Sequence, residues 1–191
     1  MTGKEDIRRI NDDLAARFRK IEKTLSSART IAGLFEALVG GIEREFAVPF
    51  VWLTFMDRPE AEILTDAAAA SKILKSRFSV VSGELLEKIL GDGLKPVLSN
   101  QNLRPFYRLM PRSQKYFVRS IAVVPFALNG RMIGVWNNGD ADANRYLPDM
   151  DTALLAALAD RISLRLTQLA TRKNAASAAK KSAEQPGGLH G

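Results

Sequence analysis

Apolar residues recur every three or four positions in the first part of the chain, which is the period of an amphipathic helix. Charged residues fill the other faces, so we predict a helix over 4–26 with a narrow apolar stripe. The stripe consists of Ile7, Ile10, Leu14, Phe18, Ile21 and Leu25. A broader apolar face predicts a second helix over 28–46, and the short connection favours an antiparallel helix pair.

The next segment changes from helical spacing to a dense apolar run. Residues 48–56 are rich in aromatic and β-branched side chains and predict a buried strand. Residues 60–77 are ambiguous, although an alanine run within them favours a helix. Ser82 is a suitable N-cap for a short helix over 83–90, and Gly91 is a suitable stop.

A hairpin is the clearest local signal in the chain. The apolar runs 119–128 and 131–138 are separated by Asn129-Gly130, the pair preferred in two-residue type I′ turns. Such a turn places residue 126 opposite residue 133 and Pro125 opposite Gly134. A short strand over 95–99 should therefore pair only with the part of 119–128 that avoids Pro125, which lacks an amide hydrogen.

The last long apolar stripe predicts a helix that begins at Pro148 and continues past Leu169. We expect an N-terminal amphipathic helix over 1–27, a folded domain over 28–170 and a disordered basic tail over 171–191, which has almost no large apolar residue. The order of elements predicts an α+β fold. In it, an antiparallel sheet carries the N- and C-terminal helices on one face.

Composition removes most enzyme chemistry. The 191 residues include no cysteine, and the single histidine is His190. Disulfide frameworks, cysteine-ligated metal sites, thiol nucleophiles and histidine triads are therefore excluded or improbable. We expect no catalytic residue and no metal site, and the sequence identifies no cofactor. There is neither a membrane-spanning apolar run nor a signal-peptide pattern, so we expect a cytoplasmic protein.

The net charge of +7 is spread unevenly. Residues 1–30 and 171–191 each carry an excess of three positive charges, whereas 31–170 has sixteen basic and fifteen acidic residues. A nucleic-acid-binding domain usually concentrates basic residues on its folded surface. The partition therefore makes nucleic acid an improbable partner, and leaves weak association through the basic ends as an alternative.

The hairpin region also resembles a known family. The stretch RSIAVVPFALNGRMIGVWNNGD at 119–140 looks like the closing hairpin of GAF domains. The stretch DANRYLPDMDTALL at 142–155 looks like the entry to their last helix, and its Arg-Tyr-x-Pro-x-Met pattern is closer to domain of unknown function family 484, a GAF-like bacterial family. The specific part of this resemblance covers 119–165.

The resemblance implies a five- or six-stranded antiparallel sheet, a small-molecule pocket and dimerisation through the first and last helices, with no catalysis. Members that hold bilins use a cysteine, which this chain lacks. The segment 57–118, in which GAF domains carry ligand contacts, matches only loosely.

Candidate ligand-binding residues come mainly from the long irregular segment 100–118. Several side chains here could line a pocket for an anionic ligand, with solvated loop charges as the alternative. They are Arg104, Tyr107, Arg108, Arg112 and Arg119. Tryptophan in a strand is more often core than a stacking surface. The candidate set is Asn100, Arg104, Tyr107, Arg108, Arg119 and Trp136.

These observations predict a non-enzymatic sensory or regulatory GAF-like module. We expect a homodimer, formed through the N- and C-terminal helices, that binds a small molecule or a protein partner. The alternatives are a ligand-free dimerisation scaffold and weak nucleic-acid association through the basic ends.

Overall fold

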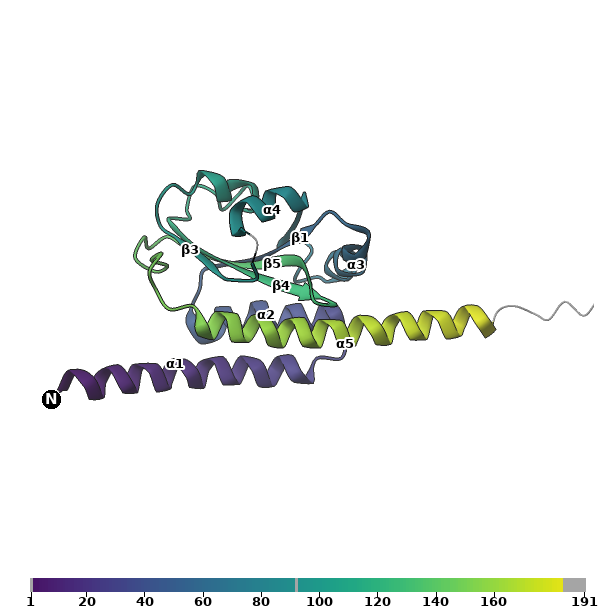
Figure 1. Ribbon diagram of the computed structural model, residues 1–191, viewed down its shortest axis with the longest axis horizontal. Coiled ribbons are helices and arrows are strands. Elements are labelled where there is room, and N and C mark those ends of the chain that lie inside the picture. Colours follow the sequence, from purple (N-terminus) through teal and green to yellow (C-terminus); the bar gives the residue numbers. More distant parts are fainter. Residues whose placement is uncertain (1, 92, 184–191) are drawn as a thin grey trace, which may run out of the picture.

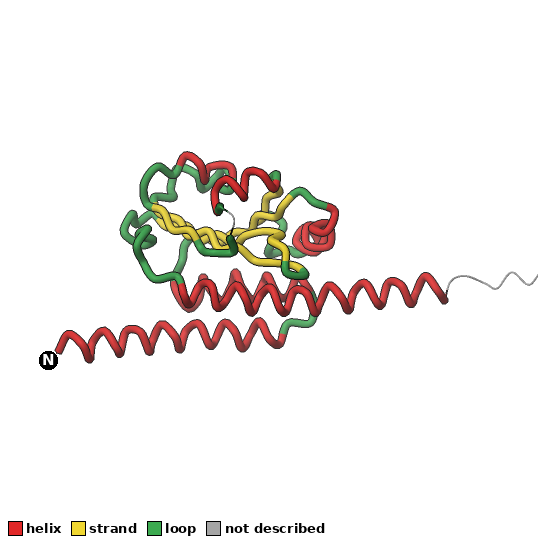
Figure 2. Tube along the Cα trace, in the orientation of Figure 1, coloured by secondary structure: helices red, strands yellow, loops and turns green. Residues whose placement is uncertain are grey.

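Two long helices pack on one face of a sheet, a third long helix packs on the outside of these two, and shorter elements cover the other face (Figure 1, Figure 2). The computed structural model describes residues 2–91 and 93–183. Its helices are α1 (Thr2–Ser27), α2 (Ile31–Phe46), α3 (Glu62–Ala70), α4 (Gly83–Leu90) and α5 (Ala153–Ala183). The layer with α1, α2 and α5 is called the helix layer below, and the layer with α4 and the irregular segment 100–118 is called the distal layer.

The sheet has five strands in the order β2-β1-β5-β4-β3. They are β1 (Phe50–Met56), β2 (Phe78–Val81), β3 (Val97–Ser99), β4 (Ser120–Leu128) and β5 (Arg131–Asp140). The α+β class is confirmed, but the sheet is mixed rather than antiparallel throughout, because β1 and β2 run parallel. β2 is a four-residue edge strand with no buried position, and no strand is predicted at these residues.

The predicted hairpin forms, with a different register. Asn129 and Gly130 have φ values of 52° and 76°, as a type I′ turn requires. A bulge between Phe126 and Ala127 then shifts the pairing by one residue, so Phe126 faces Gly134. Pro125 consequently faces Val135, and the prediction that it faces Gly134 is wrong.

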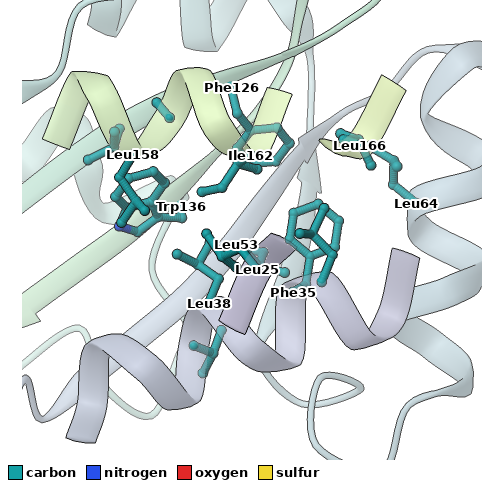
Figure 3. Packing of buried hydrophobic residues seen from close by; sticks show 14 of the residues in the cluster. Leu25, Phe35, Leu38, Leu53, Leu64, Phe126, Trp136, Leu158, Ile162 and Leu166 are labelled. Carbon is teal, nitrogen blue, oxygen red and sulfur yellow. The ribbon is translucent and has the colours of Figure 1, made fainter. Parts of the chain in front are cut away.

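Both faces of the central strands are buried. All nine residues of β4 are buried, and its side chains alternate between two separate clusters. The larger cluster joins the sheet to the helix layer through side chains such as Phe35, Phe126 and Trp136 (Figure 3). The smaller cluster, which includes the fully buried Trp52, joins the sheet to the distal layer. The distal layer is therefore part of the folded core.

The short helix α4 matches its prediction. The Ser82 hydroxyl accepts a hydrogen bond from the Leu85 amide at 3.4 Å, and Gly91 ends the helix with a φ of 70°. The last helix differs from its prediction at both ends. It begins at Ala153 rather than Pro148. The Asp151 carboxylate accepts a hydrogen bond from the Ala153 amide at 2.8 Å at this start.

The other end of α5 corrects the expected disordered tail. The helix continues to Ala183, and every residue over 171–183 is exposed. Alanine has the highest helix propensity, which explains a helix here without tertiary packing. The rest of the expected tail, 184–191, lies outside the described residues. No helix in the described part of the chain is long and apolar enough to cross a membrane.

Close approach of β5 to β1 requires glycine at position 134. A Cβ there would lie 2.6 Å from the backbone oxygen of Thr54. We predict that Gly134→Ala lowers the free energy of unfolding by about 2 kcal/mol or more, because the strands must separate. The matched control is Gly40→Ala in α2, where a Cβ meets nothing within 4 Å.

The control variant should be more stable than the wild type by about 0.5–1 kcal/mol, the helix advantage of alanine over glycine. Urea unfolding followed by circular dichroism measures both variants. Equal stability of Gly134→Ala and the wild type would contradict the stated strand contact.

Candidate functional site

A hollow of about 590 Å³ opens in the distal layer, between one edge of the sheet and the irregular segment. One wall consists of Ser79 and Val81 of β2 with Ser82 and Leu85 at the start of α4. The other wall is formed by the segment 107–115. Its lining side chains are Tyr107, Arg108, Met110, Pro111, Arg112 and Lys115.

Apolar anchors hold this segment over the sheet. Phe106, Leu109 and Met110 are buried in the distal cluster. The indole Nε1 of Trp52 donates a hydrogen bond to the Leu109 carbonyl at 2.5 Å, which fixes the segment above β1. A 3₁₀ turn over Arg104–Arg108 turns Tyr107 outward, away from these anchors. The anchors thus explain how a segment without regular structure keeps its place.

Hydrogen bonds connect the hollow to the sheet interior. The Ser79 hydroxyl, which lines the hollow, donates to Thr54 Oγ1 at 3.3 Å. Asn137 of β5 donates its side-chain amide to the same oxygen at 3.1 Å. The Asn137 Oδ1 is buried without a hydrogen-bond partner among the described residues. A buried polar group of this kind is costly unless a partner reaches it.

Positive charge dominates the hollow. Three basic side chains line it, and within the described ranges none of them forms an ion pair. Lys115 Nζ lies 5.4 Å from the centroid of the Tyr107 ring. Guanidinium groups bind carboxylate and phosphate with paired hydrogen bonds. The hollow is therefore chemically suited to an anion, with the two serine hydroxyls as further hydrogen-bonding groups.

The structure separates the candidate residues of the sequence analysis. Tyr107 and Arg108 line the hollow, whereas Arg104 and Arg119 are exposed outside it and Asn100 lies at the end of β3. Trp136 does not belong with them. It is fully buried in the cluster under the helix layer, on the other sheet face (Figure 3).

Other lining residues were not in the predicted set. Lys115 could have been found from its place among the basic residues of the same segment. Nothing local indicates ligand binding by Ser79 or by Ser82, which is predicted only as a helix N-cap, because the parallel pairing of β2 with β1 brings this segment to the hollow.

A second concavity, of about 230 Å³, lies between the helices and the 140–152 connection. Leu14 and Phe18 of α1 and Leu154 of α5 give it apolar walls. Asn138 and Tyr146 add polar groups, and the Oδ1 of Asn138 has no hydrogen-bond partner within the described ranges. We call this concavity the α1–α5 groove.

Burial raises the pKa of Tyr146 to about 12, although the nearby charge of Arg145 acts in the opposite direction. Arg145 itself donates to the backbone oxygen of Phe46 at 2.5 Å and lies 3.5 Å from the Asp140 carboxylate. These contacts tie the connection between β5 and α5 to the end of α2. The phenol of Tyr146 therefore belongs to the folded structure in its neutral form.

Comparison with solved structures identifies the architecture. A GAF domain from a phosphoenolpyruvate-protein phosphotransferase of Coxiella burnetii superposes with a TM-score of 0.58 at 14% identity, covering 87% of this chain and 97% of that one. The chain has a GAF-like fold. No family model matches the sequence, and no curated protein matches it.

Two further solved structures resemble the fold of this chain. One is a far-red absorbing dark state with bound biliverdin IXα, with a TM-score of 0.53 at 14% identity and coverage of 80% and 98%. The other is a free methionine-R-sulfoxide reductase from Neisseria meningitidis in complex with its substrate, with a TM-score of 0.52 at 16% identity and coverage of 82% and 89%. At these identities the likeness establishes the fold alone.

The raised pKa of Tyr146 gives a pH prediction. The unfolded chain loses the phenol proton at about pH 10, whereas the folded chain keeps it up to about pH 12. Stability should therefore fall as the pH rises through this interval, because the unfolded state binds fewer protons. Tyr146→Phe has no phenol to ionise. Relative to this variant, the free energy of unfolding of the wild type should therefore fall by about 2 kcal/mol over the interval.

Urea unfolding at several pH values between about 9 and 11.5 measures this difference, since most of the unfolded phenol ionises in that range. A difference that stays constant with pH would contradict the buried neutral phenol.

Proposed function

We propose that this chain is a non-enzymatic regulatory module that binds a small anionic molecule in the distal hollow and acts as a homodimer. The observation that carries the proposal is the set of unpaired cations Arg108, Arg112 and Lys115, which line one hollow held open beside the core. Among the described residues none of the three forms an ion pair, and the printed side-chain contacts of Lys115 are with the Tyr107 and Tyr116 rings.

The lining chemistry supports binding rather than catalysis. The residues around the hollow supply hydroxyl groups, positive charges and apolar surface, and they include no carboxylate, histidine or cysteine. General acid–base or nucleophilic catalysis usually requires such a group near the bound molecule. The biliverdin-bound and substrate-bound neighbours are consistent with a GAF-like fold that holds small molecules.

The overhanging half of α1 supports the homodimer. Residues 3–13 are all exposed, and this half projects beyond the sheet (Figure 1). Ile7 and Ile10 are 61% and 56% exposed and continue the apolar stripe that α1 buries further along. Exposed Leu154 of α5 borders the adjacent α1–α5 groove. A second copy would supply matching apolar surfaces through a two-fold axis.

β5 provides a physical route between ligand and dimer. Asn137 belongs to the hydrogen-bond chain under the hollow, while its neighbour Asn138 faces the α1–α5 groove. A ligand that favours one position of β5 would shift the population of groove conformations.

Three other functions are alternatives to this proposal. A protein partner could replace the small molecule, and the fold could act as a ligand-free dimerisation scaffold. Weak nucleic-acid association through the basic ends is the third alternative. The closer resemblance to domain of unknown function family 484 rests on residues 119–165 and stays a prediction.

Titration with inorganic phosphate and a panel of phosphorylated and carboxylated metabolites tests the hollow. We predict amide chemical-shift changes concentrated at 107–115 and 79–82, and their loss in Arg108→Gln/Arg112→Gln, which removes two anion-binding groups. Lys72→Gln removes one exposed charge elsewhere and is the control. Shifts spread evenly over the surface, or unaffected by the double substitution, would argue against the site.

Substitution in the overhang tests the dimer. We predict that Ile10→Glu converts the protein to a monomer in sedimentation equilibrium, because it places a charge in the apolar interface. Arg8→Gln lowers the charge by the same single unit on the polar side of α1, away from the stripe, and should leave the dimer intact. A wild type that sediments as a monomer, or a dimer that tolerates Ile10→Glu, would overturn this interface.

A further inference from the structure

Basic residues cluster in the distal layer far more than the composition of the whole domain suggests. Between residues 93 and 139 the chain has seven lysine or arginine residues and no acidic residue. Five of them lie in the segment 104–119, namely Arg104, Arg108, Arg112, Lys115 and Arg119. None of the five forms an ion pair within the part of the chain that the structure describes.

Aromatic rings on the same segment are exposed. Tyr116 and Phe117 have 86% and 61% of their surface exposed, and Tyr107 is exposed as well. Lys115 Nζ lies 5.4 Å from the centroid of Tyr107 and 5.8 Å from that of Tyr116, so one ammonium group stands between two rings. Since neighbouring Phe106 and Leu109 are buried as anchors, the exposed rings are not needed to hold the segment down.

We propose that the surface formed by residues 104–119 binds single-stranded nucleic acid, with the five cations on phosphates and the three rings stacked on bases. Cationic grooves with exposed aromatic side chains are how proteins bind single strands without strong sequence preference. The proposal goes beyond the small-anion site, because Arg104, Tyr116, Phe117 and Arg119 lie outside the hollow.

The geometry favours a single strand over other polyanions. The faces of duplex bases are covered by stacking, so exposed rings would add nothing to a duplex complex. An anionic bilayer is a second class of target for aromatic and basic side chains. However, Arg108, Arg112 and Lys115 line a concavity, which a flexible strand can enter and a flat bilayer cannot.

Fluorescence anisotropy with labelled oligothymidylate of about 15 nucleotides tests the proposal on the full chain. We expect Tyr116→Ala/Phe117→Ala to weaken binding by about tenfold for each ring that stacks. Tyr116→Phe keeps the ring and should bind like the wild type. Both altered positions are exposed, so folding is preserved, which circular dichroism verifies.

Charge variants separate this surface from the basic ends. Arg104→Gln/Arg119→Gln should reduce the slope of log affinity against log salt by about 0.7 for each lost phosphate contact. Lys180→Gln/Lys181→Gln, on the exposed extension of α5, should leave the affinity unchanged. A loss confined to the α5 variant would overturn the proposal in favour of the basic ends.

Comparison ligands complete the test. A duplex of the same length and phosphatidylserine vesicles should bind at least tenfold more weakly than the single strand, or without dependence on the two rings. The proposal is overturned if the strand and the duplex bind equally and neither depends on the two rings. It is also overturned if vesicles bind through the rings while the single strand does not bind. If inorganic phosphate still causes chemical-shift changes at the hollow but no single strand binds, this inference fails and the small-anion site stands. If phosphate causes no chemical-shift changes, the small-anion site is the proposal that fails.

Discussion

The rest of the structure depends on the burial of the central strands on both faces. Every residue of β4 is buried, and seven consecutive residues of β5 are buried beside it. Such a sheet is stable only if apolar side chains cover each face, because its strands expose apolar surface in both directions. The helix layer meets this requirement with long amphipathic helices, and the distal layer meets it with a few anchors on short or irregular elements.

The two coverings leave different outer surfaces. A helix that buries one stripe offers a regular outer face, whose charges are of both signs in α1. The distal segment buries Phe106, Leu109 and Met110 and turns the intervening side chains outward. Because these are Tyr107 and Arg108, and Arg112 and Lys115 follow in the same segment, one segment both covers the core and presents a cationic, aromatic surface. Core packing thus positions the candidate site.

Local signals explain what could be predicted from the sequence. The first two helices, the hairpin with its Asn129-Gly130 turn and the capped helix after Ser82 each rest on residues close together in the chain. The features that were not predicted, or were predicted wrongly, depend on residues far apart in the chain. The parallel pairing of β2 has no local period, and the bulge at Phe126 changes a register that the turn alone would fix.

The candidate site shows the same division. Tyr107 and Arg108 could be selected because a long irregular segment with arginines is informative by itself. The sheet face on which Trp136 lies could not be predicted. Both faces of β5 are buried, so the alternation of its side chains does not indicate which of them point toward the helix layer. The cationic surface is not visible in the net charge of 31–170, because acidic residues elsewhere in the domain balance the basic residues of the acid-free segment 93–139.

Alternation along β5 also links the two candidate regions. Asn137 points to the distal face, where its amide reaches Thr54 Oγ1, and Asn138 points to the helix face at the α1–α5 groove. Each has an Oδ1 without a partner among the described residues. Adjacent residues of a paired strand cannot move independently, so a displacement of Asn137 by the proposed ligand would also displace Asn138. Because Gly134 lets β5 lie close against the backbone of β1, the strand pairing opposes that displacement along most of its length. At the Asp140 end of β5, Arg145 connects the strand to the end of α2.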